Sequence, residues 1–88
     1  MADIKGQFEQ AKKDVETLSK RPSNEDFLFL YAHFKQANGG DVKGDRPGLL
    51  DMVGRAKFDA WSKLKGMKPD DAMKKYVDKV TGLLKTHR

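Results

Sequence analysis

The side chains best suited to hold an anionic ligand in this 88-residue chain are a tyrosine and two lysines. Tyr31 and Lys35 are four residues apart, so on a helix the phenol and the ammonium group lie one turn apart on one face. Lys57 lies one helical turn from both Val53 and Trp61, where its methylenes can pack along apolar surface. Each residue taken singly is also typical of a core tyrosine or a solvated lysine. Together they favour an anion-binding face beside apolar surface.

The segment 26–40, DFLFLYAHFKQANGG, carries more apolar surface than one core-facing stripe requires. Five apolar or aromatic residues are consecutive at 27–31, and on a helix Phe29 points away from the face that holds Phe27 and Tyr31. A surface helix ordinarily covers a single stripe. This helix is therefore either buried on several sides, or it packs the core with one face and binds a ligand with another. The tyrosine–lysine pair favours the second interpretation.

No residue pattern suited to catalysis or metal binding follows from the spacing. The chain has no cysteine, and His33 has neither a carboxylate nor a second histidine at metal-binding spacing. No Ser-His-Asp set and no carboxylate pair can be argued. The glycine-containing segment 41–50 lacks the P-loop and dinucleotide-binding spacings, and no strand precedes it. We therefore expect no enzyme activity, no metal and no cofactor.

The charge of the chain suits an anionic partner. Eighteen basic residues against thirteen acidic ones give a formal net charge of +5, which fits a phosphorylated ligand, a nucleic acid or an acidic membrane surface. A solvated, lysine-rich helical surface explains the charge equally well, because the two signs are interspersed. A basic helical nucleic-acid-binding module is the alternative function, but no dense basic stripe, helix-turn-helix spacing or disordered basic arm supports it.

The composition also limits size and location. No stretch approaches the ~20 apolar residues of a membrane-spanning helix, and the first ten residues lack the hydrophobic region of a secretory signal. The absence of cysteine fits a reducing compartment. We expect one domain, residues 1–88, with a modest core and a cytoplasmic location.

Hydrophobic periodicity predicts four helices and no strand, and hence an all-α bundle. The first is expected over residues 3–19 and is interpreted as structural. The second runs from Ser23 to about Asn38, the third covers 51–64, and the fourth begins at Pro69. The apolar stripe of the first helix consists of Ile4, Phe8, Ala11, Val15 and Leu18.

Glycine and proline residues indicate how the predicted helices are connected. Segment 41–50 is expected to be a long loop between the second and third helices. Within it, residues 46–48 are expected to form a turn that leads Leu49 and Leu50 onto the core. Gly66 is expected to end the third helix as its C′ residue.

Four sequence blocks together resemble the acyl-CoA-binding protein family, also called the diazepam-binding inhibitor family. The blocks run in order over nearly the whole chain with their helical spacing intact. They are Arg21-Pro22 with Leu30 to Ala37 and Gly40-Asp41, Arg46 to Asp51, Gly54 to Trp61, and Asp71 to Val80.

The resemblance implies a fold and a function. Members are four-helix bundles of up-down-down-up topology with a long loop between helices 2 and 3. They bind long-chain fatty acyl-CoA esters, one per monomer, and have no enzymatic activity of their own. The expected role is a cytoplasmic, soluble, monomeric carrier and pool-former for acyl-CoA. It would make transient contact with lipid-metabolising enzymes or membranes and would bind no nucleic acid.

The resemblance also implies which residues bind each part of the ligand. Those matching the positions for the CoA phosphates and adenosine are Arg21, Tyr31, Phe34, Lys35, Lys57 and Tyr76. Those matching the positions along the acyl chain are Phe27, Leu28 and Ala56. The tail is expected to dominate affinity, since each buried methylene contributes about 0.8 kcal/mol. The head group is expected to set orientation and to select CoA esters over free fatty acids.

Four positions depart from the family pattern. Phe34 stands where tyrosine is usual, which keeps a ring for stacking but removes a hydroxyl. Val53 stands where lysine is frequent, which removes one cation near the site, and Glu16 replaces a basic residue on the first helix. Phe58 replaces a tryptophan, which we interpret as a change of packing.

Overall fold

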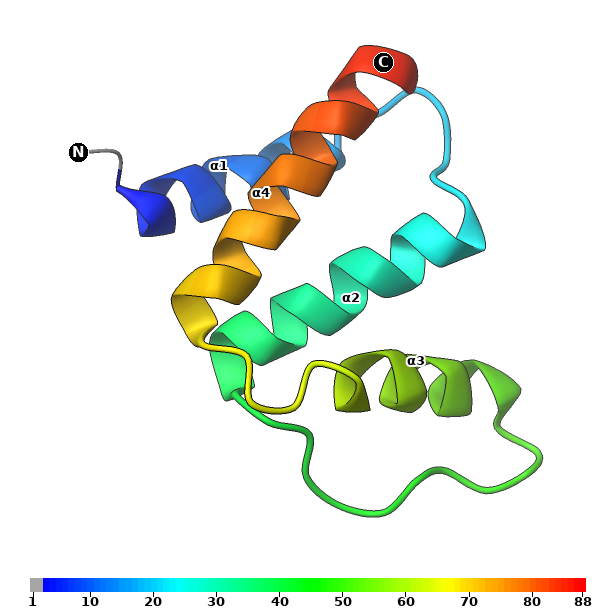
Figure 1. Cartoon of the computed structure of the whole chain (residues 1–88). Helices are drawn as coiled ribbons and strands as arrows, with labels where there is room; N and C mark the ends of the chain where they lie inside the picture. The colour runs from blue at the N-terminus through cyan, green and yellow to red at the C-terminus, as the bar shows by residue number, and fades with distance from the viewer. Residues whose placement is uncertain (1–2) are drawn as a thin grey trace.

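Helices are the only regular secondary structure in the computed structural model over residues 3–88, which are the residues it describes (Figure 1). They are α1 (Ile4–Val15), α2 (Asn24–Gly39), α3 (Met52–Ser62) and α4 (Pro69–Thr86). The expected all-α class with four helices is therefore confirmed for this part of the chain.

Local sequence signals explain where the helices begin. The side chains of Asp3, Ser23 and Asp51 each accept a hydrogen bond from a backbone N–H in the first turn of α1, α2 and α3. Pro69 opens α4, where its fixed φ suits the first helical position. Gly40 follows α2 with φ at +74°, a backbone conformation that glycine adopts readily.

The first helix is shorter than the range 3–19 that its apolar stripe predicts. It ends at Val15, and the chain then turns toward the far end of α4. There the backbone N–H groups of Ser19 and Lys20 both donate to the carbonyl oxygen of His87, at 2.9 and 3.0 Å. Their hydrogen bonds tie the α1–α2 connection to the C-terminal end of α4 instead of extending α1.

The third helix is also shorter than the predicted range 51–64. The Ser62 hydroxyl donates to the carbonyl oxygens of Phe58 and Asp59, at 2.8 and 3.2 Å, and the helix ends at this serine. Gly66 has φ at +88° as a turn residue requires, but it lies four residues beyond the helix end and is not its C′ residue.

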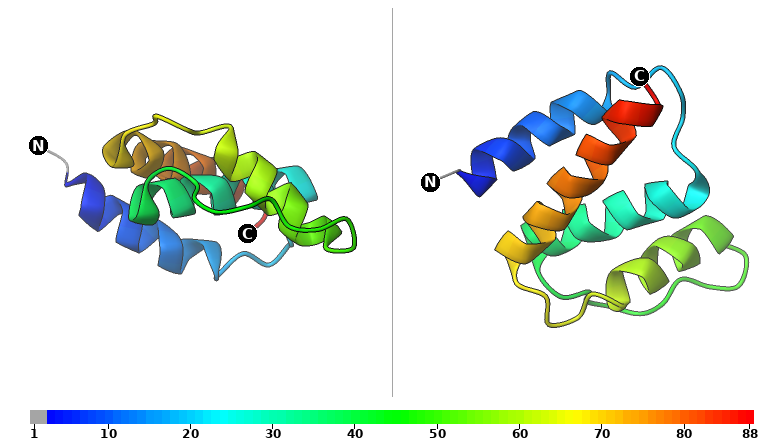
Figure 2. Two further views of the ribbon diagram at one scale, coloured as in Figure 1. Left: turned by 90° about the horizontal axis from the view of Figure 1, so that it is seen from below. Right: turned by 45° about the horizontal axis from the view of Figure 1, so that its top comes forward.

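The helices form an open, flat bundle (Figures 1 and 2). α4 packs against α1 and α2, whereas α3 packs against α2 alone. α2 and α3 run in the same direction, so the connection between them must return along the whole length of the pair, as both figures show. This gives the expected up-down-down-up topology with its long loop.

The core lies mainly between α1, α2 and α4. Its buried hydrophobic members are Phe8, Ala11, Leu30, Ala37, Ala72, Met73, Tyr76, Val80 and Leu83. α3 contributes no fully buried residue. The molecule measures 39 × 30 × 15 Å, and its thinnest dimension is little more than one helix diameter of about 10–12 Å. Apolar side chains on α2 and α3 consequently stay partly uncovered.

A buried glutamine holds α3 in place. Gln36 is 1% exposed, and its amide nitrogen donates to the Asp41 carboxylate and to the Met67 carbonyl, at 2.9 and 2.8 Å. Its amide oxygen accepts from the Trp61 indole N–H at 3.0 Å, and the same N–H also donates to the Gly40 carbonyl at 2.9 Å. The network ties α2, both connections of α3 and α3 itself together, because buried polar groups require partners.

The expectation that Leu49 and Leu50 lie on the core is wrong. Their side chains are 78% and 101% exposed. The N–H of Asp51 donates to the Gly48 carbonyl at 3.0 Å, so the turn leads directly into the cap of α3. Since α3 covers only α2, no core surface lies within reach of these leucines.

Candidate ligand-binding site

Two neighbouring hollows share the ring of Phe27, which is 43% exposed. The first, the aromatic hollow, has a volume of about 330 Å³, and the second, the α2–α3 hollow, about 310 Å³. The aromatic hollow is lined by Val15, Pro22, Phe27, Leu30, Tyr31, Phe34 and Tyr76. The α2–α3 hollow is lined by Arg21, Asn24, Phe27, Leu28, Met52, Val53 and Ala56.

Helical spacing places three rings of α2 on the face that borders these hollows. Phe27, Tyr31 and Phe34 are four and three residues apart, so they follow one face of the helix. The Phe34 ring lies 6.4 Å from the Tyr76 ring of α4, and Phe8 of α1 packs edge-on against Tyr76 at 5.1 Å. Rings from α2 and α4 therefore line the aromatic hollow, with Phe8 of α1 packed behind Tyr76, an arrangement that suits a flat heterocycle.

Tyr76 is held neutral at the back of the aromatic hollow. It is 5% exposed. Burial raises the pKa of its hydroxyl, and the negative charge of Glu16 raises it further. The phenol therefore remains a hydrogen-bond donor throughout the physiological pH range.

Lys57 places a cation over two of the rings that line the hollows, although it lines neither hollow itself. Its ammonium nitrogen lies 5.2 Å from the centroid of the Tyr31 ring and 5.7 Å from that of Phe27. These are cation–π distances. The lysine comes from α3 and the two rings from α2, so the pairing depends on the packing of these helices.

Lys35 is oriented differently from Lys57. Its ammonium nitrogen lies 5.1 Å from the Trp61 ring, near the end of α3. It lines neither hollow, although it is one helical turn from Tyr31. Of the nine residues that the sequence nominates, it is the one that the structure leaves apart.

The other eight residues are brought together. Tyr31, Phe34 and Tyr76 line the aromatic hollow, Arg21, Leu28 and Ala56 line the α2–α3 hollow, Phe27 lines both, and Lys57 lies over their shared ring.

A second cation near the aromatic hollow comes from α1, the helix that the sequence presents as structural. The Lys12 ammonium nitrogen lies 5.6 Å from the Phe34 ring and 5.2 Å from the Phe8 ring, and it pairs with Glu9 at 2.9 Å. Lys12 and Tyr76 line an adjoining depression. The available signal was the four-residue spacing of this lysine from Phe8, which places the two on one helical face.

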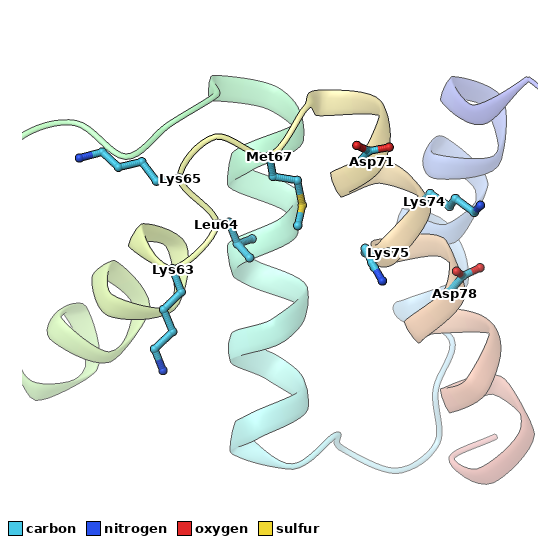
Figure 3. Close-up of a pocket in the computed structure, with 8 residues that line it drawn as sticks. All are labelled: Lys63, Leu64, Lys65, Met67, Asp71, Lys74, Lys75 and Asp78. Carbon is cyan, nitrogen blue, oxygen red and sulfur yellow. The ribbon is translucent and has the colours of Figure 1, made fainter.

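A larger hollow, the lysine groove, contains none of the nominated residues (Figure 3). This lysine groove has a volume of about 620 Å³ and lies between the end of α3 and α4. Its lining residues are Lys63, Leu64, Lys65, Met67, Asp71, Lys74, Lys75 and Asp78. Figure 3 shows the four lysine side chains extending in different directions and not toward one point.

Residues 3–88 offer neither a cluster of metal ligands nor a membrane-spanning helix. No group of three or more histidine, aspartate or glutamate side chains there could hold a metal ion. No helix in this range is long and apolar enough to cross a bilayer. His33 is buried, stacks on Phe29 at 4.1 Å and donates from Nδ1 to the Phe29 carbonyl at 2.7 Å. Burial lowers the pKa of this histidine, which is what a packed, neutral side chain requires.

Comparison with known proteins connects this geometry to one family. The family model described as acyl CoA binding protein matches residues 5–80. An acyl-CoA-binding protein homolog of Manduca sexta is 50% identical over 82 residues, covering 92% of this chain and 91% of its own. A homolog of the same description from Drosophila melanogaster is 47% identical over 81 residues, covering 92% of this chain and 94% of its own.

Solved structures agree with the sequence comparison. The crystal structure of acyl-CoA-binding protein 2 of Oryza sativa superposes with a TM-score of 0.89 at 39% identity, covering 93% of this chain and 89% of its own. The crystal structure of the Moniliophthora perniciosa acyl-CoA-binding protein gives a TM-score of 0.87 at 39% identity, covering 97% and 82%. Family model, relatives and superposition lead to one conclusion: the chain belongs to the acyl-CoA-binding protein family.

Proposed function

We propose that the protein binds long-chain fatty acyl-CoA esters, one per monomer, and serves as a carrier and pool-former for them. The observation that carries this proposal is the pair of hollows that share Phe27, with the Lys57 cation over the shared ring. An acyl-CoA ester has a polyanionic nucleotide at one end and a hydrocarbon tail at the other. A ring-lined hollow beside an aliphatic one, with cations at their edge, matches both parts.

The aromatic hollow is the proposed site of the adenosine end. Stacking of a base on an aromatic ring contributes about 1–3 kcal/mol in nucleic-acid binders. Phe34 retains such a ring in place of the usual tyrosine, and Tyr76 supplies a neutral hydroxyl. The phosphates would be held by Tyr31 and Lys57 through charge-assisted hydrogen bonds.

Lys35 and Arg21 complete the proposed phosphate site. Lys35 lies over the Trp61 ring. To reach a phosphate beside Tyr31, its flexible side chain would have to leave this ring and extend toward the preceding helical turn. Arg21 lines the α2–α3 hollow and is exposed, so its guanidinium is free to approach the CoA phosphates. A planar guanidinium is well matched to phosphate oxygens.

The α2–α3 hollow is the proposed site of the acyl chain. Phe27, Leu28 and Ala56 line it, as the family pattern implies, and Met52 and Val53 extend it. At about 0.8 kcal/mol for each buried methylene, a sixteen-carbon tail outweighs every polar contact of the head group. The tail therefore dominates affinity, and the head group selects CoA esters over free fatty acids.

In this proposal the chain binds its ligand without converting it. Residues 1–88 act as one acyl-CoA-binding domain, monomeric and cytoplasmic, with no cofactor or metal. Ligand would be exchanged in transient encounters with lipid-metabolising enzymes or with membranes.

Isothermal titration with palmitoyl-CoA at low protein concentration tests the proposal. One saturable site per chain is expected, with far weaker binding of CoA and of palmitate, each of which lacks one half of the ligand. Absence of saturable, near one-to-one binding would overturn it. Prolonged incubation of the complex should release no free thiol, whereas thiol release would indicate a hydrolase.

A further inference from the structure

The turn before α3 and the first residues of α3 expose four large apolar side chains that are close together in the sequence. This leucine patch consists of Leu49, Leu50, Met52 and Val53, with exposed fractions of 78%, 101%, 78% and 66%. Exposed apolar side chains are common singly on protein surfaces, but a cluster of neighbours on a chain this small indicates an interaction surface.

The exposure of this patch is built into the fold. The backbone of the turn is closed by the hydrogen bond from Asp51 N–H to the Gly48 carbonyl, and the Asp51 side chain caps α3. The loop is also anchored to α3, because the Arg46 guanidinium forms two hydrogen bonds with the Asp59 carboxylate, at 2.9 and 2.7 Å. The leucines are thus presented outward by a fixed turn.

The patch is continuous with the proposed acyl-chain site. Met52 and Val53 belong to the patch and also line the α2–α3 hollow together with Phe27 and Ala56. A hydrocarbon chain that lies against the leucines can therefore enter the hollow over apolar surface, without crossing water.

Cations border the patch. Arg21 lines the α2–α3 hollow, and Arg46 and Arg55 line an adjoining depression with Leu49 and Met52. The Nε of Arg55 is buried with no hydrogen-bond partner among residues 3–88. Arg46 is paired with the Asp59 carboxylate, so Arg21 and Arg55 are the cations of this border that no ion pair neutralises within residues 3–88.

We propose that the leucine patch inserts into the surface of a phospholipid bilayer and docks the α2–α3 hollow against the lipid, so that acyl-CoA is taken up directly from the membrane. The proposal rests on the proposed acyl-CoA binding. Apolar side chains that enter the headgroup layer, bordered by cations, are characteristic of interfacial membrane binding.

A bilayer fits this surface better than a second copy of the chain. Leu50 projects fully into solvent, so the patch is a protrusion that needs a deformable apolar medium. A symmetric dimer would bring two arginine borders together. Four side chains also fall well short of the ~800 Å² per partner that stable protein interfaces bury.

Flotation with phospholipid vesicles, with and without phosphatidylserine, tests this surface. The L49S/L50S variant should lose about tenfold or more of the vesicle-bound fraction, because two leucines no longer transfer from water. It should also take up palmitoyl-CoA more slowly from preloaded vesicles. The L49M/L50M variant, which keeps apolar side chains, should behave as the wild type.

Titration in solution separates the two proposals. L49S/L50S should bind dissolved palmitoyl-CoA within about twofold of the wild type, since neither leucine lines the α2–α3 hollow. Unchanged vesicle binding by this variant would overturn the membrane proposal, as would a concentration-dependent dimer that the substitutions abolish. Vesicle binding by a wild-type protein that fails to bind acyl-CoA would overturn only the proposed function.

Discussion

The lysine groove and the pair of hollows around Phe27 both contain lysines beside apolar side chains, yet they differ in how the lysines are held. In the groove, Lys63, Lys65, Lys74 and Lys75 extend in different directions (Figure 3). None of them lies over an aromatic ring within residues 3–88. At the hollows, Lys57 and Lys12 lie over rings contributed by other helices.

Under the proposed function, a concentration of positive charge does not by itself make a binding site. A solvated lysine loses much side-chain entropy when it binds an anion. A lysine already held over a ring has lost part of that freedom during folding. The smaller hollows are therefore better prepared for a phosphorylated ligand than the larger groove.

Removing the ring that the two hollows share should have the largest effect on binding. Phe27→Ala is expected to weaken palmitoyl-CoA binding by about 3 kcal/mol, since contacts to both halves of the ligand are lost. Phe27 is 43% exposed, so the free energy of unfolding should change far less. Titration calorimetry with urea denaturation checks both quantities.

Phe29→Ala is the matched control, because this phenylalanine stacks on His33 and lines neither hollow. Equal loss of affinity in the two variants would contradict the assignment of the hollows.

The Gln36 network should matter for stability more than for ligand chemistry. Gln36→Ala removes hydrogen bonds to Asp41, Met67 and Trp61 at a buried position, and we expect a loss of about 2–3 kcal/mol in the free energy of unfolding. α3 should loosen first, because it packs on α2 alone. Urea denaturation and amide hydrogen exchange measure these effects. If all four helices lost protection from amide hydrogen exchange equally, this would contradict the role of Gln36 in holding α3 in place.

The two kinds of lysine can be compared directly. Lys57→Ala should weaken palmitoyl-CoA binding by about 2 kcal/mol, as expected when a charge-assisted hydrogen bond is removed. Lys74→Ala removes the same charge from the lysine groove and should change affinity little beyond a salt-dependent effect. If both variants lose similar affinity for palmitoyl-CoA in high salt, the position of the Lys57 cation over aromatic rings does not contribute to binding.

The lysine of α1 is expected to contribute less. Lys12→Met keeps an unbranched stem near the Phe8 and Phe34 rings but removes the cation, and we expect about 1 kcal/mol weaker binding of palmitoyl-CoA. Lys5→Met serves as the control, because this exposed lysine of α1 lines neither hollow nor the adjoining depression. Titration of both variants with palmitoyl-CoA shows whether Lys12 takes the role of the basic residue that the family has at the position of Glu16. Equal affinity in the two would exclude it.

The smallest effect should come from acidification. The Gln36 hydrogen bond, and then the Gly66 N–H, hold the pKa of the Asp41 carboxyl below the 3.8 usual for aspartate. A lowered carboxyl pKa stabilises the fold above about pH 3.8, and that contribution is lost as the pH falls through the lower, folded-state value. The Asp41→Asn variant retains an acceptor oxygen, but its side chain does not titrate between pH 7 and pH 3. Its urea midpoint should therefore fall less between pH 7 and pH 3 than that of the wild type, and an identical fall would contradict this cause.

Much of the fold follows from local sequence signals. The capping residues Ser23 and Asp51, together with Pro69, mark where three helices begin because they satisfy or replace the free N–H groups of a first turn. Most of the site residues were instead implied by the family resemblance, and the structure brings eight of those nine together. The ends of α1 and α3 were not predictable from periodicity, because hydrogen bonds to His87 and at Ser62 compete with helix extension.

The sequence by itself determined the all-α class, the helix starts and the aromatic face of α2, because these depend on interactions within a few residues. Only the tertiary structure decided that Lys57 lies over Tyr31 while Lys35 lies over Trp61, that Lys12 lies over Phe34 beside the aromatic hollow, and that Leu49 and Leu50 face solvent. The orientation of each of these side chains depends on which helix packs nearby. That packing is the sum of many weak contacts between residues distant in the chain.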